Sequence, residues 1–169
     1  MKNEKKEMLE IVDRQGNVIG LTERAVLHAD PLLIHRVVHV LVFDNEGSLL
    51  LQKRSMHKDV APGKWDTSVG GHINPGETPL AAAAREMKEE LGVSGCSLEF
   101  LYTYLFTNHR ESEIVHTFRC AFDGEVVFNQ EEIDAVRHWS LPEIQSCLGK
   151  RIFSSHFEQE IRNYLKQTS

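Results

Sequence analysis

The chain has 169 residues, 41% hydrophobic and 26% charged, which is typical of one globular domain with a buried core. Its net charge of −6 argues against a nucleic-acid-binding protein with a wide basic face, and no apolar run approaches the ~20 residues of a membrane span. The charged start, MKNEKKEMLE, lacks the apolar core of a secretory signal. Cys96, Cys120 and Cys147 are far apart and odd in number, which favours reduced thiols in a cytoplasmic protein.

The first predicted elements are strands joined by tight turns. The segment 8–24, MLEIVDRQGNVIGLTER, predicts two short strands around a turn at Gly16 and Asn17. The segment 35–55 predicts a longer hairpin, because two runs rich in β-forming residues flank the turn residues 45–47. The segment 61–73, APGKWDTSVGGHI, predicts a loop that leads into a short strand.

A helix follows this strand. Thr78 is a typical N-cap and Pro79 a typical first helical residue, so we expect the helix to run to about Leu91, with Gly92 as its C-cap. A second hairpin over 98–109 and 113–122, short strands over 125–128 and 137–141, and helices over 142–148 and 155–167 complete the chain. The sum predicts one mixed α/β (α+β) domain spanning 1–169.

The helix over 79–91 groups its acidic residues unusually. A helical projection places an apolar stripe on one side and three glutamates on the other, near the C-terminal end where the helix dipole disfavours negative charge. Oxygen ligands grouped in this way favour Mg²⁺ or Mn²⁺, and the alternative is a solvated acidic face. The stripe is Leu80, Ala84, Met87 and Leu91, and the glutamates are Glu86, Glu89 and Glu90.

The segment 71–93 resembles the Nudix box, G-x5-E-x7-R-E-U-x-E-E-x-G-U, at every position. The resemblance implies a Nudix fold, with a mixed sheet sandwiched between helices, here extended by an N-terminal β-hairpin. It also implies metal-assisted hydrolysis, in which the ion polarises phosphoryl oxygens and activates a water. The matching residues are Gly71, Glu77, Arg85, Glu86, Met87, Glu89, Glu90, Gly92 and Val93.

The resemblance also assigns roles within the box. Glu86 and Glu90 correspond to the principal metal ligands, and Glu89 to a further ligand or the general base. The carbonyl of Gly70 corresponds to an additional ligand. Arg85, with Glu77, corresponds to a pair that orients the glutamates.

The span 10–141 is similar to the isopentenyl diphosphate isomerase branch of this superfamily, through HADPLLIHRVVHVLVF and GKWDTSVGGH. That likeness implies a second divalent ion, Zn²⁺ or Mn²⁺, and basic contacts to a diphosphate. His39 is a poorer candidate alongside His35, because strand residues four apart lie about 13 Å from each other and cannot share one ion. The alternative is that these are ordinary surface residues. The metal candidates are His28, His35, His72, Glu111 and Glu113, and the diphosphate contacts are Arg24, Arg54 and Lys58.

One departure separates the chain from the isomerases: their catalytic cysteine falls at Gly70. Isomerisation needs an acid and a base on either side of an alkene, and glycine supplies neither. We therefore expect a hydrolase of a nucleoside di- or triphosphate or another organic diphosphate. The alternatives are an isomerase-like enzyme and a non-catalytic sensor of a phosphorylated ligand. Glu131 and Glu132 form a further loop candidate for the base, and a monomer or a homodimer is left open.

Overall fold

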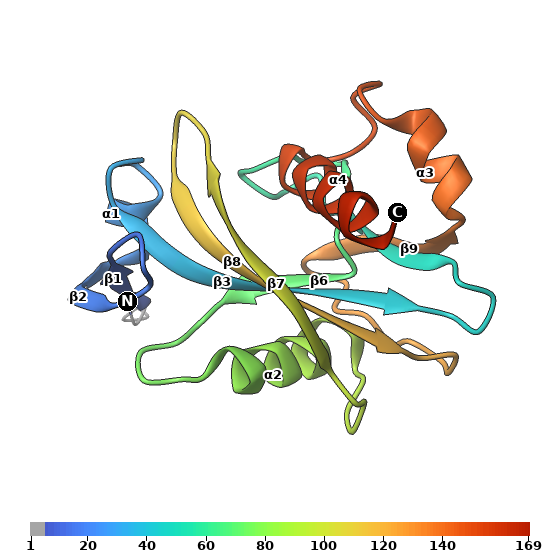
Figure 1. Cartoon of the computed structure of the whole chain (residues 1–169), viewed down its shortest axis with the longest axis horizontal. Helices are drawn as coiled ribbons and strands as arrows, with labels where there is room; N and C mark the ends of the chain where they lie inside the picture. The colour runs from blue at the N-terminus through green and yellow to red at the C-terminus, as the bar shows by residue number, and fades with distance from the viewer. Residues whose placement is uncertain (1–5) are drawn as a thin grey trace.

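The computed structural model describes residues 6–169, and the charged residues 1–5 at the start of the chain lie outside that part. Within 6–169, one mixed sheet of nine strands lies between helix α2 on one side and helices α3 and α4 on the other (Figure 1). This arrangement confirms the predicted fold class. No helix in this range is long and apolar enough to cross a membrane.

The elements follow the predicted order closely, including the N-terminal hairpin. The strands are β1 (Met8–Val12), β2 (Val18–Glu23), β3 (Ile34–Phe43), β4 (Leu49–Arg54), β5 (Trp65–Asp66), β6 (Val69–His72), β7 (Glu99–Thr107), β8 (Ser112–Ala121) and β9 (Ile133–Trp139). The helices are α1 (Arg24–Leu27), α2 (Pro79–Leu91), α3 (Leu141–Cys147) and α4 (Ser155–Thr168).

Strand β3 organises the sheet. It pairs in parallel with β8 along its whole length and antiparallel with β6 over four residues. Its hairpin partner β4 touches it only at Phe43 and Leu49, and then diverges to pair with β5 and β9. Strand β6 pairs only with β3 among the described residues, so its other edge faces the gap that opens beside β4.

The side chains on the two faces of β3 pack in two separate hydrophobic cores, because successive side chains of a strand point to opposite sides. Val38, Val40 and Val42 pack with the buried face of α2. Leu41, on the other face, packs with the apolar residues of α4, such as Phe157. The remaining odd-numbered residues of β3 therefore face the same side as α4.

Helix α2 begins and ends as the sequence predicts. The Thr78 hydroxyl accepts a hydrogen bond from the Ala81 amide at 3.2 Å, and Gly92 adopts the left-handed conformation with φ 67°. The predicted apolar stripe is partly wrong. Leu80 is 52% exposed and Ala84 is also exposed, whereas the buried face consists of Ala82, Ala83, Met87, Leu91 and the carboxylate-bearing Glu90.

The prediction of a strand over 125–128 is also wrong. This segment is irregular and crosses the end of α2. There the Val127 amide donates to the Leu91 carbonyl at 3.1 Å, and the Asn129 amide donates to the Glu90 carbonyl at 3.0 Å. The segment satisfies carbonyls that the last turn of a helix leaves free, and its Val126 and Phe128 pack against the core beside α2.

Candidate active site

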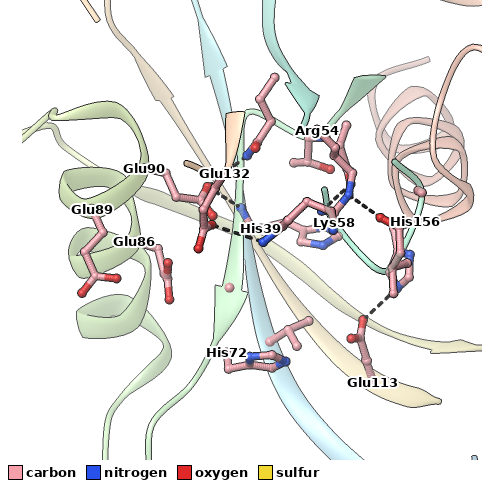
Figure 2. Close-up of a pocket in the computed structure, with 18 of the residues that line it drawn as sticks. His39, Arg54, Lys58, His72, Glu86, Glu89, Glu90, Glu113, Glu132 and His156 are labelled. Atoms are coloured by element: carbon pink, nitrogen blue, oxygen red, sulfur yellow. Dashed lines mark hydrogen bonds and ion pairs between the residues drawn. The ribbon is translucent and has the colours of Figure 1, made fainter. Parts of the chain in front are cut away.

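A cavity of ≈ 370 Å³ lies at the free edge of β6, between α2, the sheet and the start of α4 (Figure 2). Of the predicted catalytic, metal and substrate-binding residues, all line the cavity except His35, which is fully buried beneath it, whereas Glu77 and the loop candidate Glu131 do not line it. The cavity therefore joins two clusters of ligand-type side chains, one on α2 and one assembled from strands.

The first cluster, called here the α2 carboxylates, comprises Glu86, Glu89 and Glu90. Glu90 is 8% exposed, and its Oε2 accepts hydrogen bonds from Gln52 Nε2 at 3.0 Å and from the Gly70 amide at 3.3 Å. Glu86 is half-buried, while the Glu89 side chain is 58% exposed at the mouth. The three carboxylates thus extend from the solvent into the gap between helix and sheet, which corrects the idea that all three lie opposite the core.

Arg85 ties the α2 carboxylates to the loop before the helix. Its guanidinium makes a two-pronged contact with Glu77, with Nε at 2.8 Å and Nη2 at 3.0 Å from the two carboxylate oxygens. Nη1 also donates to Glu86 at 2.8 Å and to Glu89 at 3.3 Å. A planar guanidinium that is fixed on one side in this way restricts the orientation of the glutamates on the other.

The pKa values of two of the α2 carboxylates are raised, which favours a bound cation. Burial, reinforced by the charges of Glu89 and Glu132, raises the pKa of Glu86 to about 7 although Arg85 opposes the shift. Burial, followed by the charge of Glu86, raises the pKa of Glu90 well above its usual value. Carboxylates that are costly to ionise together become stable as anions when a divalent ion lies between them.

The two glycines before α2 differ in what surrounds them. The Ile73 amide donates to the Arg36 carbonyl, so the alternation of an antiparallel ladder directs the N–H and C=O of Gly70 away from β3, toward the cavity. A Cβ on Gly71 would lie 2.2 Å from the Glu86 carboxyl carbon, whereas a Cβ on Gly70 would approach His39 only to 3.4 Å. Glycine at 71 therefore makes room for Glu86, and Gly70 presents a carbonyl oxygen beside it.

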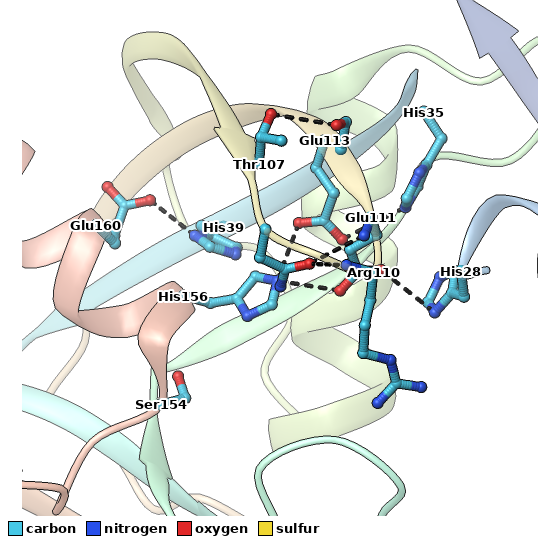
Figure 3. A network of polar contacts seen from close by, with 12 residues as sticks. His28, His35, His39, Thr107, Arg110, Glu111, Glu113, Ser154, His156 and Glu160 are labelled. Atoms are coloured by element: carbon cyan, nitrogen blue, oxygen red, sulfur yellow. Dashed lines mark hydrogen bonds and ion pairs between the residues drawn. The ribbon is translucent and has the colours of Figure 1, made fainter. Parts of the chain in front are cut away.

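The second cluster, called here the His/Glu cluster, comprises His28, His35, His72, Glu111 and Glu113. Figure 3 shows these residues except His72, which is labelled in Figure 2. Strand register brings it together, because His35 pairs directly with Glu113 across β3 and β8. The Nε2 atoms of His28 and His72 are 3.1 Å apart, and His35 Nε2 lies 3.4 Å from Glu113 Oε1.

The donor set of the His/Glu cluster fits a divalent metal. Both ring nitrogens of His35 and Oε2 of Glu111 are buried without a hydrogen-bond partner among residues 6–169. Such groups are costly unless something else satisfies them. Burial lowers the pKa of His28 to about 4 despite the opposing charge of Glu111, so its imidazole is neutral and able to bind an ion near neutral pH.

Sequence reasoning missed His156, at the start of α4. Its Nε2 lies 3.4 Å from Glu111 Oε1 and 3.4 Å from Glu113 Oε2, and its ring stacks on Phe106 with centroids 4.1 Å apart. Burial opposes protonation of His156, but the two carboxylates raise its pKa. No local motif marks this residue, because its partners lie on a strand far away in the sequence.

The predicted basic residues line the other side of the cavity. Arg54 donates from Nε to the Val60 carbonyl at 2.8 Å, and Lys58 Nζ lies 3.5 Å from Glu132. Arg24 stands at the opposite rim with a half-exposed side chain. Of the two loop glutamates, Glu132 lines the cavity and Glu131 does not. The cavity therefore holds basic side chains as well as the α2 carboxylates, and Arg54 and Lys58 each lie near an acidic residue, Asp66 and Glu132.

Comparison with known proteins shows which family and which folds this chain is similar to. The family model described as NUDIX domain matches residues 33–158. An isopentenyl-diphosphate Delta-isomerase of Streptomyces griseus is 48% identical, over 89% of this chain and 79% of the relative. An uncharacterized Nudix hydrolase of Yersinia pestis is 36% identical, over 81% of this chain and 74% of the relative. The crystal structure of a Deinococcus radiodurans protein superposes with a TM-score of 0.82 at 23% identity, over 93% of this chain and 98% of that one, which shows a shared fold.

Proposed function

Because the chain belongs to the Nudix family, in the branch similar to isopentenyl diphosphate isomerases, we propose that it is a metal-dependent hydrolase of pyrophosphate bonds. Its substrate would be a nucleoside di- or triphosphate or another organic diphosphate. The observation that carries the proposal is the grouping of Glu86 and Glu90 with Gly70 in a cavity that basic side chains also line.

The α2 carboxylates have distinct places in this mechanism. Glu86, Glu90 and the Gly70 carbonyl would hold Mg²⁺ or Mn²⁺, which when bound polarises phosphoryl oxygens and lowers the pKa of a water. Glu89 lies at the solvent-exposed mouth. It would either accept the proton of the attacking water or serve as a further metal ligand. Arg85 keeps these carboxylates oriented through its contact with Glu77.

The basic residues of the cavity support the assignment of a phosphorylated substrate. Arg54 and Lys58 face the α2 carboxylates across the cavity (Figure 2), and Arg24 also lines it. Their charges would balance phosphate groups that the α2 carboxylates alone would repel. The phosphate chain would then lie between the metal and these cations.

The His/Glu cluster supports a second divalent ion, Zn²⁺ or Mn²⁺. Three imidazoles and two carboxylates form two overlapping groups there, and three of their buried polar atoms have no hydrogen-bond partner within residues 6–169. Mixed nitrogen and oxygen ligands suit these ions better than Mg²⁺. We assign this ion a role in fixing the base of the cavity, next to the site of hydrolysis.

A second candidate function is isomerisation of isopentenyl diphosphate, which the 48% identity to a protein of that name favours. Gly70 argues against it, since the residue at this place offers the cavity no side chain. None of the three cysteines lines the cavity to replace one. A sensor that binds a phosphorylated ligand without turnover is a third reading.

A substrate panel separates these reactions. The wild-type protein would be incubated with nucleoside triphosphates, nucleoside diphosphate conjugates and isopentenyl diphosphate, each with Mg²⁺, with Mn²⁺ and with chelator. The proposal expects cleavage of a pyrophosphate bond in at least one compound, abolished by chelator. An allylic isomer as the only product would establish the isomerase, and tight binding without any turnover would establish the sensor.

A further inference from the structure

His39 lies on the cavity-facing side of β3, directly opposite Gly70 on β6. It lines the cavity, although only 6% of its surface is exposed. Gly70 has no side chain. The imidazole of His39 is the group nearest to the position that a Cβ of Gly70 would occupy, at 3.4 Å. One edge of the ring is thus open to the cavity beside the Gly70 carbonyl.

The other edge of the ring is fixed by Glu160 of α4 (Figure 3). His39 Nδ1 lies 2.7 Å from Glu160 Oε2. The Glu160 carboxylate is completely buried, and it also accepts hydrogen bonds from three hydroxyl groups. These come from Tyr102 at 2.6 Å, Tyr104 at 2.9 Å and Thr117 at 2.9 Å.

This network determines the tautomer of His39. Burial opposes ionisation of Glu160, but the hydrogen bonds from His39 and the tyrosines hold its pKa below the usual value. An ionised carboxylate only accepts hydrogen bonds, so Nδ1 must be the donor. Nε2 is then the ring nitrogen available to the cavity, and it makes no hydrogen bond to any of residues 6–169.

A buried carboxylate with four donors is an expensive way to pack a helix, since an apolar side chain of similar volume is often as stable. Its arrangement is better explained by the orientation of one imidazole toward the cavity, as carboxylates orient histidines in many enzymes. We propose that His39 contacts the substrate, donating a hydrogen bond from Nε2 to a phosphate oxygen of a diphosphate beside Gly70, and that Glu160 is its positioning residue.

The inference names a ligand contact in the proposed hydrolase site, and so it rests on the proposed function for the identity of the ligand as a diphosphate. A carboxylate on one side of the ring and a phosphate oxygen on the other are both acceptors, so the ring takes up one proton from solvent when the diphosphate binds and then donates from both nitrogens. Such charge-assisted hydrogen bonds are among the stronger ones in proteins. The contact would place His39 opposite the metal held by the α2 carboxylates.

The first test observes the ring directly, without any substitution. Wild-type protein containing ¹⁵N-labelled histidine would be titrated with methylenediphosphonate, a diphosphate that cannot be hydrolysed, in the presence of Mg²⁺. The His39 signals, assigned by their loss in His39→Gln, should show the Nδ1–H tautomer and a shift of Nε2 on addition. No movement of the His39 Nε2 signal overturns the proposal, whatever the other histidines do.

The second test is kinetic. His39→Gln should lower kcat/KM by about 10- to 100-fold, the loss expected for a hydrogen bond to a charged group, and Glu160→Gln by about 10-fold. His138→Gln, an exposed histidine on β9 outside the cavity, should stay within about twofold. The double variant His39→Gln/Glu160→Gln avoids leaving a buried unpaired charge, so it keeps the test valid if the single variants unfold. Full activity in the folded double variant contradicts the proposal.

The two tests separate this inference from the proposed function. If the wild type cleaves no pyrophosphate bond, the hydrolase proposal fails, yet a diphosphate-induced shift at His39 still supports the contact. If hydrolysis occurs and the ring does not respond, only the assignment of His39 fails.

Discussion

The α2 carboxylates and the His/Glu cluster line the same cavity but are built in different ways. The carboxylates come from one helix and are oriented by a neighbour on that helix, Arg85. The His/Glu cluster takes its residues from β3, β6 and β8, from the position just after α1 and from the position just before β8, and it depends on the register that sets His35 beside Glu113. A local cluster can be changed by one helix residue, whereas an assembled cluster depends on the whole sheet.

The two clusters also differ in electrostatics. The α2 carboxylates combine burial with mutual repulsion, so the pKa values of Glu86 and Glu90 are raised. In the His/Glu cluster, burial acts against ionisation too, but His156 and His35 lower the pKa of Glu113. This repulsion, which Arg85 relieves only in part, favours an external cation in the first cluster, whereas the second already contains part of its own compensation. This difference is why we assign hydrolysis to the first.

Among the predictions that test this comparison, the largest loss of activity is expected for a change of Gly71, beside the α2 carboxylates. Gly71→Ala would place a Cβ 2.2 Å from the Glu86 carboxyl carbon, so Glu86 must move and kcat/KM for hydrolysis should fall about 100-fold. Leu80→Ala, at an exposed position of the same helix outside the cavity, is the control and should change kcat/KM by no more than about threefold. Steady-state kinetics measures both. Equal losses in the two variants would mean that the cavity does not depend on the position of Glu86.

A smaller effect on hydrolysis is expected from the His/Glu cluster. His35→Gln should remove one equivalent of bound Zn²⁺ or Mn²⁺, measured by elemental analysis, while kcat/KM for hydrolysis falls by no more than about 10-fold. His109→Gln, an exposed histidine, is the control for both quantities. A loss of hydrolysis as large as that caused by changing Glu90 would transfer the reaction to the His/Glu cluster and reverse the comparison.

The smallest effect concerns the stability of the metal-free protein. A carboxyl group whose pKa is raised on folding stabilises the fold at low pH, and this contribution is lost as pH rises through the folded-state pKa. For Glu86 the window runs from its ordinary 4.5 to about 7. His28 and His116, whose pKa values are lowered to about 4 on burial, act in the opposite direction below pH 6.5. We therefore compare the wild type with Glu86→Gln.

Urea unfolding at pH 5 and pH 8 measures this difference. Without metal, the free energy of unfolding of the wild type should fall relative to that of Glu86→Gln between these values, and saturating Mg²⁺ should abolish the relative loss. A constant difference at both pH values would show that Glu86 is not held near charges that resist its ionisation.

The sequence predicted the local parts of this site and missed the assembled ones. Thr78 and Gly92 bound α2 because caps act over one turn. The apolar stripe was misplaced at Leu80 and Ala84, which are exposed. A helical projection gives the angle of each residue around the helix but not the position of the sheet that covers it. Glu90 is buried through contacts with Gln52 and Gly70, which come from other elements.

The residues on α4 show the same limit more strongly. That helix has the apolar spacing of a packing element, and Phe157 and Ile161 are indeed buried. His156 and Glu160 each lie one residue before these positions, and their partners are on β3, β7 and β8. Their place in the site depends on how α4 lies across the sheet, which no spacing within the helix encodes.

The most direct test of the central claim is the rate of pyrophosphate-bond cleavage as a function of Mg²⁺ concentration, compared among the wild type, Glu90→Gln and Lys88→Gln. Lys88 is exposed on the same helix and does not line the cavity. The account predicts saturable dependence on Mg²⁺ in the wild type and in Lys88→Gln, and a kcat/KM lower by about 1,000-fold in Glu90→Gln. Cleavage by Glu90→Gln at the wild-type rate and with the wild-type Mg²⁺ dependence would contradict it.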